Sequence, residues 1–153
     1  MGFLDKLKGA VNAVTGGGAK VTLEFQPATA SPGDNVLVKV SAQSSGAEVK
    51  SKGLFIDLHG TEHVHIKHNQ VTGVAQDVNC TKQSLEVSLQ VAPEFVLAAN
   101  ETKLFEGTIQ IPQNLQPTYQ GPFARHEVQI RARVESFGND PDSGFVPIRI
   151  GAK

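Results

Sequence analysis

The chain has 153 residues and a mass of 16.3 kDa, which is the size of one domain, because domains typically hold roughly 100–200 residues. Its 39% hydrophobic residues can build a core, and its one cysteine excludes a disulfide-rich fold. The 14 basic and 15 acidic residues give a net charge of −1, which argues against a nucleic-acid binder, since such proteins carry a clustered basic excess. No run approaches the roughly 20 apolar residues of a membrane-spanning helix, and charged residues interrupt the N-terminus where a signal peptide would be apolar. We therefore expect a cytoplasmic protein.

The first fifteen residues carry apolar side chains at helical spacing, namely Phe3, Leu4, Leu7, Val11 and Val14. This pattern predicts a short amphipathic helix over residues 1–15, and the three glycines after it predict a hinge over residues 16–19. Three roles stay open for the helix. It can fold back over one end of the following domain, dock in an apolar groove of a partner or of a second copy, or lie on a membrane surface.

From residue 20 to residue 153 the chain changes period, and apolar residues alternate with polar ones as in strands with one buried face. Residues 21–25 and 36–42 predict two strands joined by a turn at residues 31–34. Residues 54–66 predict a long strand, or two strands with a bulge or bend at Gly60. The alternation recurs over residues 85–91, 105–111, 128–134 and 146–150. At least seven strands with no helical period predict an all-β fold, an antiparallel β-sandwich in preference to a barrel.

Three segments of this β region resemble the arrestin-like family. Residues 105–121 form a strand that ends at Pro112 and a loop with Pro117, Thr118 and Tyr119 that leads into a long strand. The turn at residues 31–34 and the strand ending at Gly60 resemble two further parts of the same pattern. The resemblance covers about residues 21–150, which corresponds to one arrestin-like sandwich over residues 20–153. The start of the chain is similar to that of the bacterial sporulation-control branch of this family, whose members usually continue into a second sandwich.

The resemblance implies a non-catalytic scaffold or adaptor that binds another protein in a bacterial regulatory process of the sporulation or stress type. From the residues, we also expect no enzyme, because the sequence contains no nucleophile elbow, phosphate-binding loop or zinc-protease motif. The alternative is a structural protein that self-associates or lies at the membrane surface through its N-terminal helix. We expect a protein partner or self-association, weak contact with membranes at most, and neither nucleic acid nor a small-molecule substrate or cofactor.

Four of the five histidines lie between residues 59 and 68. On a strand, His63 and His65 share a face at about 6.6–6.8 Å, so these two are weak candidates for a metal site, which we do not favour because further ligands are missing. A pH sensor is the other hypothesis, because five protonated histidines would change the net charge from −1 to +4 below about pH 5.5.

Two places on the predicted structure are candidates for contact with a partner or membrane. The first is the apolar face of the N-terminal helix. The second is Phe55, which the alternation places on the polar side of its strand. Arg131 and Arg133 alternate with nearby glutamates, which predicts a solvated strand face with cross-strand ion pairs or, as an alternative, a patch for an acidic partner.

Overall fold

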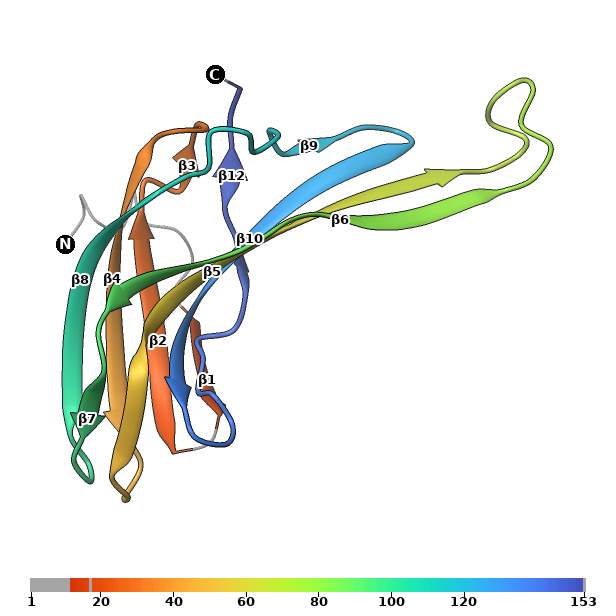
Figure 1. Ribbon diagram of the computed structural model, residues 1–153. Helices are drawn as coiled ribbons and strands as arrows, with labels where there is room; N and C mark the ends of the chain where they lie inside the picture. The colour runs from red at the N-terminus through yellow and green to blue at the C-terminus, as the bar shows by residue number, and fades with distance from the viewer. Residues whose placement is uncertain (1–11, 17, 153) are drawn as a thin grey trace.

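The computed structural model describes residues 12–16 and 18–152. They form two large β-sheets packed face to face and a third sheet of two short strands (Figure 1). The first sheet has the order β1 (Asn12–Gly16), β2 (Ala19–Gln26), β4 (Asn35–Ser44) and β8 (Thr102–Gln110). The second has the order β11 (Val146–Pro147), β10 (Ala124–Ser136), β5 (Val49–Ile66) and β6 (Val78–Ala92), with β7 (Phe95–Leu97) paired to β5 and β9 (Tyr119–Gln120) paired to β10. The predicted all-β sandwich is confirmed, and the strands of both sheets are antiparallel.

One strand pair departs from the predicted antiparallel pattern. At one end of the sandwich, β3 (Thr29–Ala30) runs parallel to β12 (Arg149–Ile150). Each strand of this pair is only two residues long. Parallel strands need a long connection, and the chain between β3 and β12 supplies it, because it includes strands of both large sheets.

The core lies between the sheets and includes most of the residues that the alternation predicted to point inward, together with residues outside the predicted strands such as Val49, Leu97 and Leu115. On β5, Leu54, Ile56 and Leu58 are fully buried, and they pair with Val134, Ala132 and Ile130 of β10. The opposite sheet supplies the inward residues of β2 and β4, namely Val21, Leu23, Phe25, Val36, Val38, Val40 and Ala42. The predicted turn also forms, with the Asp34 amide donating to the Ser31 carbonyl at 3.0 Å.

The N-terminal prediction is wrong for its last residues. Residues 12–16 are strand β1, which pairs with β2 from Asn12↔Leu23 to Gly16↔Ala19, so the helix predicted over residues 1–15 does not include residues 12–15. An isolated helix of four turns is marginal in water, whereas the edge of β2 offers a row of backbone partners. Gly16 and Ala19, the first and last residues of the predicted hinge, pair with each other where β1 meets β2. Residues 1–11 lie outside the described part of the chain.

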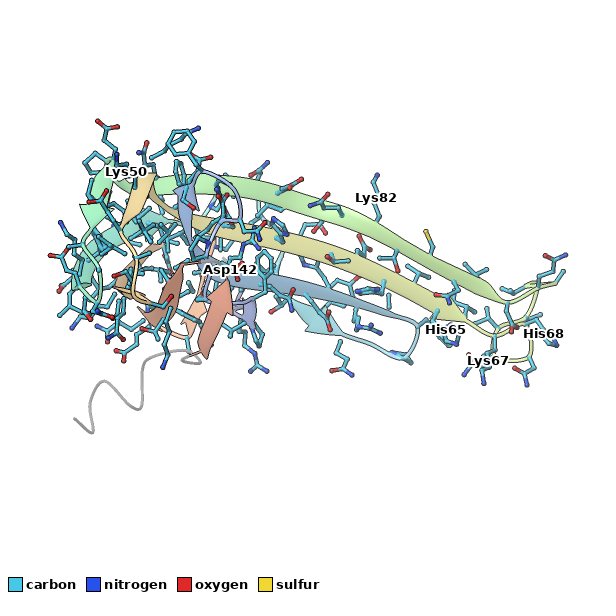
Figure 2. All side chains as sticks on the ribbon, turned by 90° about the horizontal axis from the view of Figure 1, so that it is seen from below. Lys50, His65, Lys67, His68, Lys82 and Asp142 are labelled. Atoms are coloured by element: carbon cyan, nitrogen blue, oxygen red, sulfur yellow. The ribbon has the colours of Figure 1, made fainter. Side chains whose placement is uncertain are left out.

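The second sheet extends far beyond the first. Figure 1 shows β5, β6 and the start of β10 leaving the sandwich as a narrow projection, and Figure 2 shows Lys67 and His68 near its tip. We call this projection the arm and define it as residues 61–84 and 119–127. The predicted bulge at Gly60 lies where the arm begins, because β6 has one extra residue, Ser84, between the partners of Gly60 and Thr61. The arm therefore begins at this bulge, at one end of the packed sandwich.

Candidate functional site

The arm has one face that continues the core-facing side of the sandwich. On β5 this face carries Glu62, Val64 and Ile66, in the same alternation as the buried residues before them. Across the ladder, Val64 pairs with Cys80 and Ile66 with Val78. These apolar residues are half-buried on β5, and on β6 Cys80 is exposed and Val78 is 40% exposed. This face carries apolar residues as a core strand does, apart from Glu62, but the first sheet does not extend over it (Figure 1).

The base of the arm is held by His126, which is 1% exposed. Its Nδ1 lies 2.9 Å from the carbonyl oxygen of Pro117, and its Nε2 lies 2.6 Å from the Ser84 hydroxyl. Nearby, the Tyr119 hydroxyl donates to Glu62 at 3.2 Å. Desolvation and this carboxylate both raise the pKa of Tyr119. These contacts join β5, β6, β10 and the loop before β9, so the arm is anchored by side chains as well as by its ladder.

The opposite face of the arm carries the predicted histidines. His63 lies 3.0 Å from the Thr81 hydroxyl through Nδ1 and 3.7 Å from a Glu127 carboxylate oxygen through Nε2. His65 is on the same face and is exposed. Within the described residues, no three histidine, cysteine, aspartate or glutamate side chains come together around one point. His63 and His65 thus stay the weak candidates for a metal site that they were from the sequence.

The other two histidines of the cluster have carboxylate partners of their own. His59 Nε2 lies 3.7 Å from a Glu86 oxygen, and its ring contacts Phe145 with centroids 4.5 Å apart. His68, near the tip, pairs with Asp77 at 2.8 Å. The backbone amide and then the ring of His68 lower the pKa of Asp77. His59, His63 and His68 thus have separate carboxylate partners, spread along the chain from the base of the arm to its tip.

The outer face of the second sheet holds an ion cluster around a buried carboxylate, so it is not the solvated face that the sequence predicted. Asp57 is 2% exposed and accepts hydrogen bonds from Arg131 at 2.8 Å and from Arg133 at 3.0 Å. Burial raises the pKa of Asp57, but hydrogen bonds from Arg133, Ser88 and Arg131 outweigh burial and hold that pKa below its usual range. The predicted cross-strand ion pairs are present, and both arginines are engaged within the chain.

Phe55 belongs to this cluster. It is half-buried, and the Arg133 guanidinium carbon lies 4.9 Å from its ring centroid. A stacked guanidinium of this kind stabilises an aromatic ring by a cation–π interaction. Phe55 therefore has an intramolecular partner, and contact with another protein at this residue stays a prediction.

Most of the predicted helix face falls outside the part of the chain that the structure describes. Its residues Phe3, Leu4, Leu7 and Val11 lie outside the described residues, and Val14 is part of strand β1. Among the described residues there is no helix long and apolar enough to cross a membrane.

No protein-family model matches this chain, and no curated protein matches it. Among solved structures, the crystal structure of Spo0M, a sporulation control protein from Bacillus subtilis, is similar, with a TM-score of 0.63 and 20% sequence identity. The match covers 90% of this chain and 51% of Spo0M, so the chain spans about half the length of that structure. The described residues thus have the arrestin-like fold of the sporulation control protein Spo0M.

Proposed function

We propose that this protein is a non-catalytic, arrestin-like adaptor that binds another protein through its arm in a bacterial regulatory process. The likeness to Spo0M supports the regulatory part of the proposal through the shared fold. The arm supports the binding part, because a projection with an apolar face is costly to leave in water unless it contacts something.

The observation that carries the proposal is the open edge of β6 along the arm. β6 is the last strand in its sheet among the described residues, so residues 78–84 present backbone donors and acceptors on one side. Seven residues of strand span about 23 Å. An extended segment of a partner can add to such an edge, with main-chain hydrogen bonds giving affinity and alternate side chains giving specificity.

The arm also lacks the usual protection of an exposed edge. Native edge strands are commonly shielded by charges, prolines or bulges. Between Val78 and Gln83, β6 contains one charged residue, Lys82, and its bulge at Ser84 lies at the base. The length and composition of the unshielded stretch fit a surface that is kept open for a partner.

The only cysteine of the chain gives a direct test, because Cys80 is exposed on the arm. A benzophenone attached to Cys80 through a maleimide is irradiated in lysate of the source organism, and crosslinked proteins are identified by mass spectrometry. The control is the double variant Cys80→Ser with Glu106→Cys, which moves the label to an exposed position on β8 of the first sheet. We expect a discrete protein partner from position 80 alone. The same products from both positions, or none from position 80, would contradict the proposal.

Self-association is the alternative outcome of the same experiment. If the product crosslinked at Cys80 is a second copy of this chain, and sedimentation shows a dimer or larger species, the protein is a self-assembling structural protein. Membrane contact through residues 1–11 is tested separately by vesicle sedimentation of the full chain and of a chain that begins at Asn12. That truncation keeps β1 in the first sheet, whereas a chain beginning at Ala19 would also lose a strand.

A further inference from the structure

The base of the arm contains a serine and a histidine held in contact by the fold. Ser84 is the extra residue of the bulge on β6, so it has no partner in the ladder with β5, where Gln83 pairs with Thr61 and Leu85 pairs with Gly60. Bulges commonly redirect a side chain beside a functional site. Here the bulge brings the Ser84 hydroxyl across β5 to His126 on β10, with Oγ and Nε2 2.6 Å apart.

Gly60 leaves the space in which the two side chains meet. A Cβ at this position would lie 2.5 Å from the Ser84 hydroxyl oxygen and 3.4 Å from His126 Nε2. Real Cβ atoms do not approach another atom as closely as 2.5 Å, so any side chain at residue 60 would displace the serine. Three neighbouring strands thus contribute to one arrangement, with the hydroxyl from β6, the imidazole from β10 and the open space from β5.

The contacts of His126 fix which group donates each proton. The Pro117 carbonyl can only accept, so Nδ1 of His126 carries the hydrogen in their 2.9 Å contact. In the neutral imidazole Nε2 is then the acceptor, and the Ser84 hydroxyl donates to it. This is the protonation state of a serine–histidine pair in which the histidine can act as general base, with a backbone carbonyl as the group that orients the ring.

The serine is accessible while the base is not. Ser84 is exposed, and it lines a pocket of about 270 Å³ between the arm and the loop before β9. The pocket wall also includes Lys82, Asn114 and Gln116, whose side-chain N–H groups are donors of the kind that stabilise a developing oxyanion. His126 lies beneath Ser84 and is 1% exposed, so water has little access to the base.

We propose that Ser84 is a nucleophilic serine, activated by His126, that accepts an acyl group from a small activated carboxylic ester. The Ser84 oxygen bonds to the acyl carbon as the bond between that carbon and the leaving oxygen breaks. The hydroxyl proton passes to His126 Nε2 and then to the leaving oxygen, so the products are acylated Ser84 and an alcohol. This inference is independent of the adaptor function, and it describes a covalent acceptor site on the arm.

The full-length protein is tested with two probes, a fluorophosphonate and p-nitrophenyl acetate. We expect one fluorophosphonate per chain, mapped to Ser84 by tandem mass spectrometry, and a burst of one equivalent of nitrophenolate per chain. Labelling of Ser84 should exceed that of the other serines by about 100-fold, since general-base assistance contributes roughly 10²–10⁴-fold. Ser84→Ala should abolish both signals, and Gly60→Ala should weaken both by displacing the hydroxyl.

Two controls separate activation from structure. Ser88→Ala removes a hydroxyl that donates to Asp57 at 2.7 Å, and it should label like the wild type. Thr81, which contacts the half-buried His63, should stay unlabelled. The wild-type measurement decides the question even if a variant unfolds. If folded wild-type protein takes no label at Ser84 above the level of its other serines, the serine–histidine pair only holds the arm in place and the proposal is wrong.

Discussion

At the scale of single residues, the outer face of the second sheet is organised around one buried carboxylate. Asp57 is directly opposite Arg131 in the ladder, and Arg133 is two residues further along β10. Arg133 also pairs with Asp140 at 3.3 Å, and Arg131 with Asp142 at 3.7 Å. The cluster therefore fastens the segment after β10 to the sheet, as well as neutralising a carboxylate that would be costly to bury alone.

We predict that Asp57→Asn destabilises the fold by about 2–3 kcal/mol. Breaking a fully buried pair costs roughly 3–5 kcal/mol. The loss should be smaller here because both arginines keep some contact with water. Urea unfolding measures the loss. The control is Glu48→Gln, which removes an exposed partner 4.0 Å from Lys50 and should change stability by less than about 0.5 kcal/mol. Equal losses in the two variants would show that Asp57 is not a buried anchor.

The same carboxylate gives a prediction for acid unfolding. The hydrogen-bonded Asp57 has a folded pKa below its ordinary value of 3.8, so its contribution to stability is complete above that value. The contribution is lost as the pH falls below 3.8 toward the folded pKa. We expect the unfolding free energy of the wild type to fall more steeply than that of Asp57→Asn between about pH 4 and pH 2.5, measured by urea titrations. Parallel curves for the two proteins would contradict this assignment.

Alternation in the sequence correctly placed Asp57 and Phe55 on the side of β5 away from the core. It could not show that this side is covered as well, because the covering segment, residues 137–145, has no period of its own. Phe145, for example, contacts both His59 and Arg131. Burial by an irregular segment depends on long-range contacts that a local pattern does not contain. For the same reason, the serine–histidine contact across three strands was not predicted.

At the scale of elements, β5 passes from a buried to an open environment without a change of pattern. Ile56 is fully buried, whereas Ile66, at the same parity near the end of the strand, is half-buried on the arm. Periodicity reports which residues share a face, and it does not report how far the opposing sheet extends. The prediction of a strand over residues 54–66 was therefore right. The expectation that the residues of its core-facing side are all buried was wrong. Similarly, the spacing of Val11 and Val14 predicted a helix that includes residues 12–15. In the structure, residues 12–15 pair with the edge of β2.

We predict that Ile56→Ala destabilises the protein by about 2–5 kcal/mol, as for other large-to-small changes in a core. The same change at Ile66 should cost less than about 1 kcal/mol, because this side chain is already half in water. The two variants are matched in chemistry, strand and face, so thermal and urea unfolding of the pair compare the two environments directly. A loss at Ile66 as large as at Ile56 would show that the arm face is covered in solution, as by a second copy.

At the scale of the whole molecule, the sandwich and the arm have different physical roles. The sandwich contains the core, to which both sheets contribute. The arm has a ladder of β5, β6 and the start of β10, to which the short strand β9 is added, and a few side-chain anchors near its base, with its distal part in solvent (Figure 2). Regions with few buried contacts open locally at lower free energy than the core. The arm is thus the part of the molecule that can adjust to a partner while the sandwich stays folded.

This division predicts that the distal arm can be removed without unfolding the protein. His63 pairs with Thr81 in the ladder, so residues 64–80 can be replaced by a two-residue Asn-Gly turn, the sequence preferred in tight hairpins. The removed residues include none of the buried core, and the shorter connection lowers the entropic cost of closing the hairpin. We expect the unfolding free energy to stay within about 1 kcal/mol of the wild type.

The same deletion separates folding from binding. Because it removes Cys80, the partner is first identified with the full chain, and its binding to the shortened chain is then measured by titration calorimetry. If the partner adds a strand to β6, the shortened chain loses residues 78–80, three of the seven edge residues, and should bind at least tenfold more weakly, the equivalent of about 1.4 kcal/mol. Undiminished binding by a folded, shortened chain would place the interface on the sandwich. Loss of folding would show instead that the distal arm is part of the core structure.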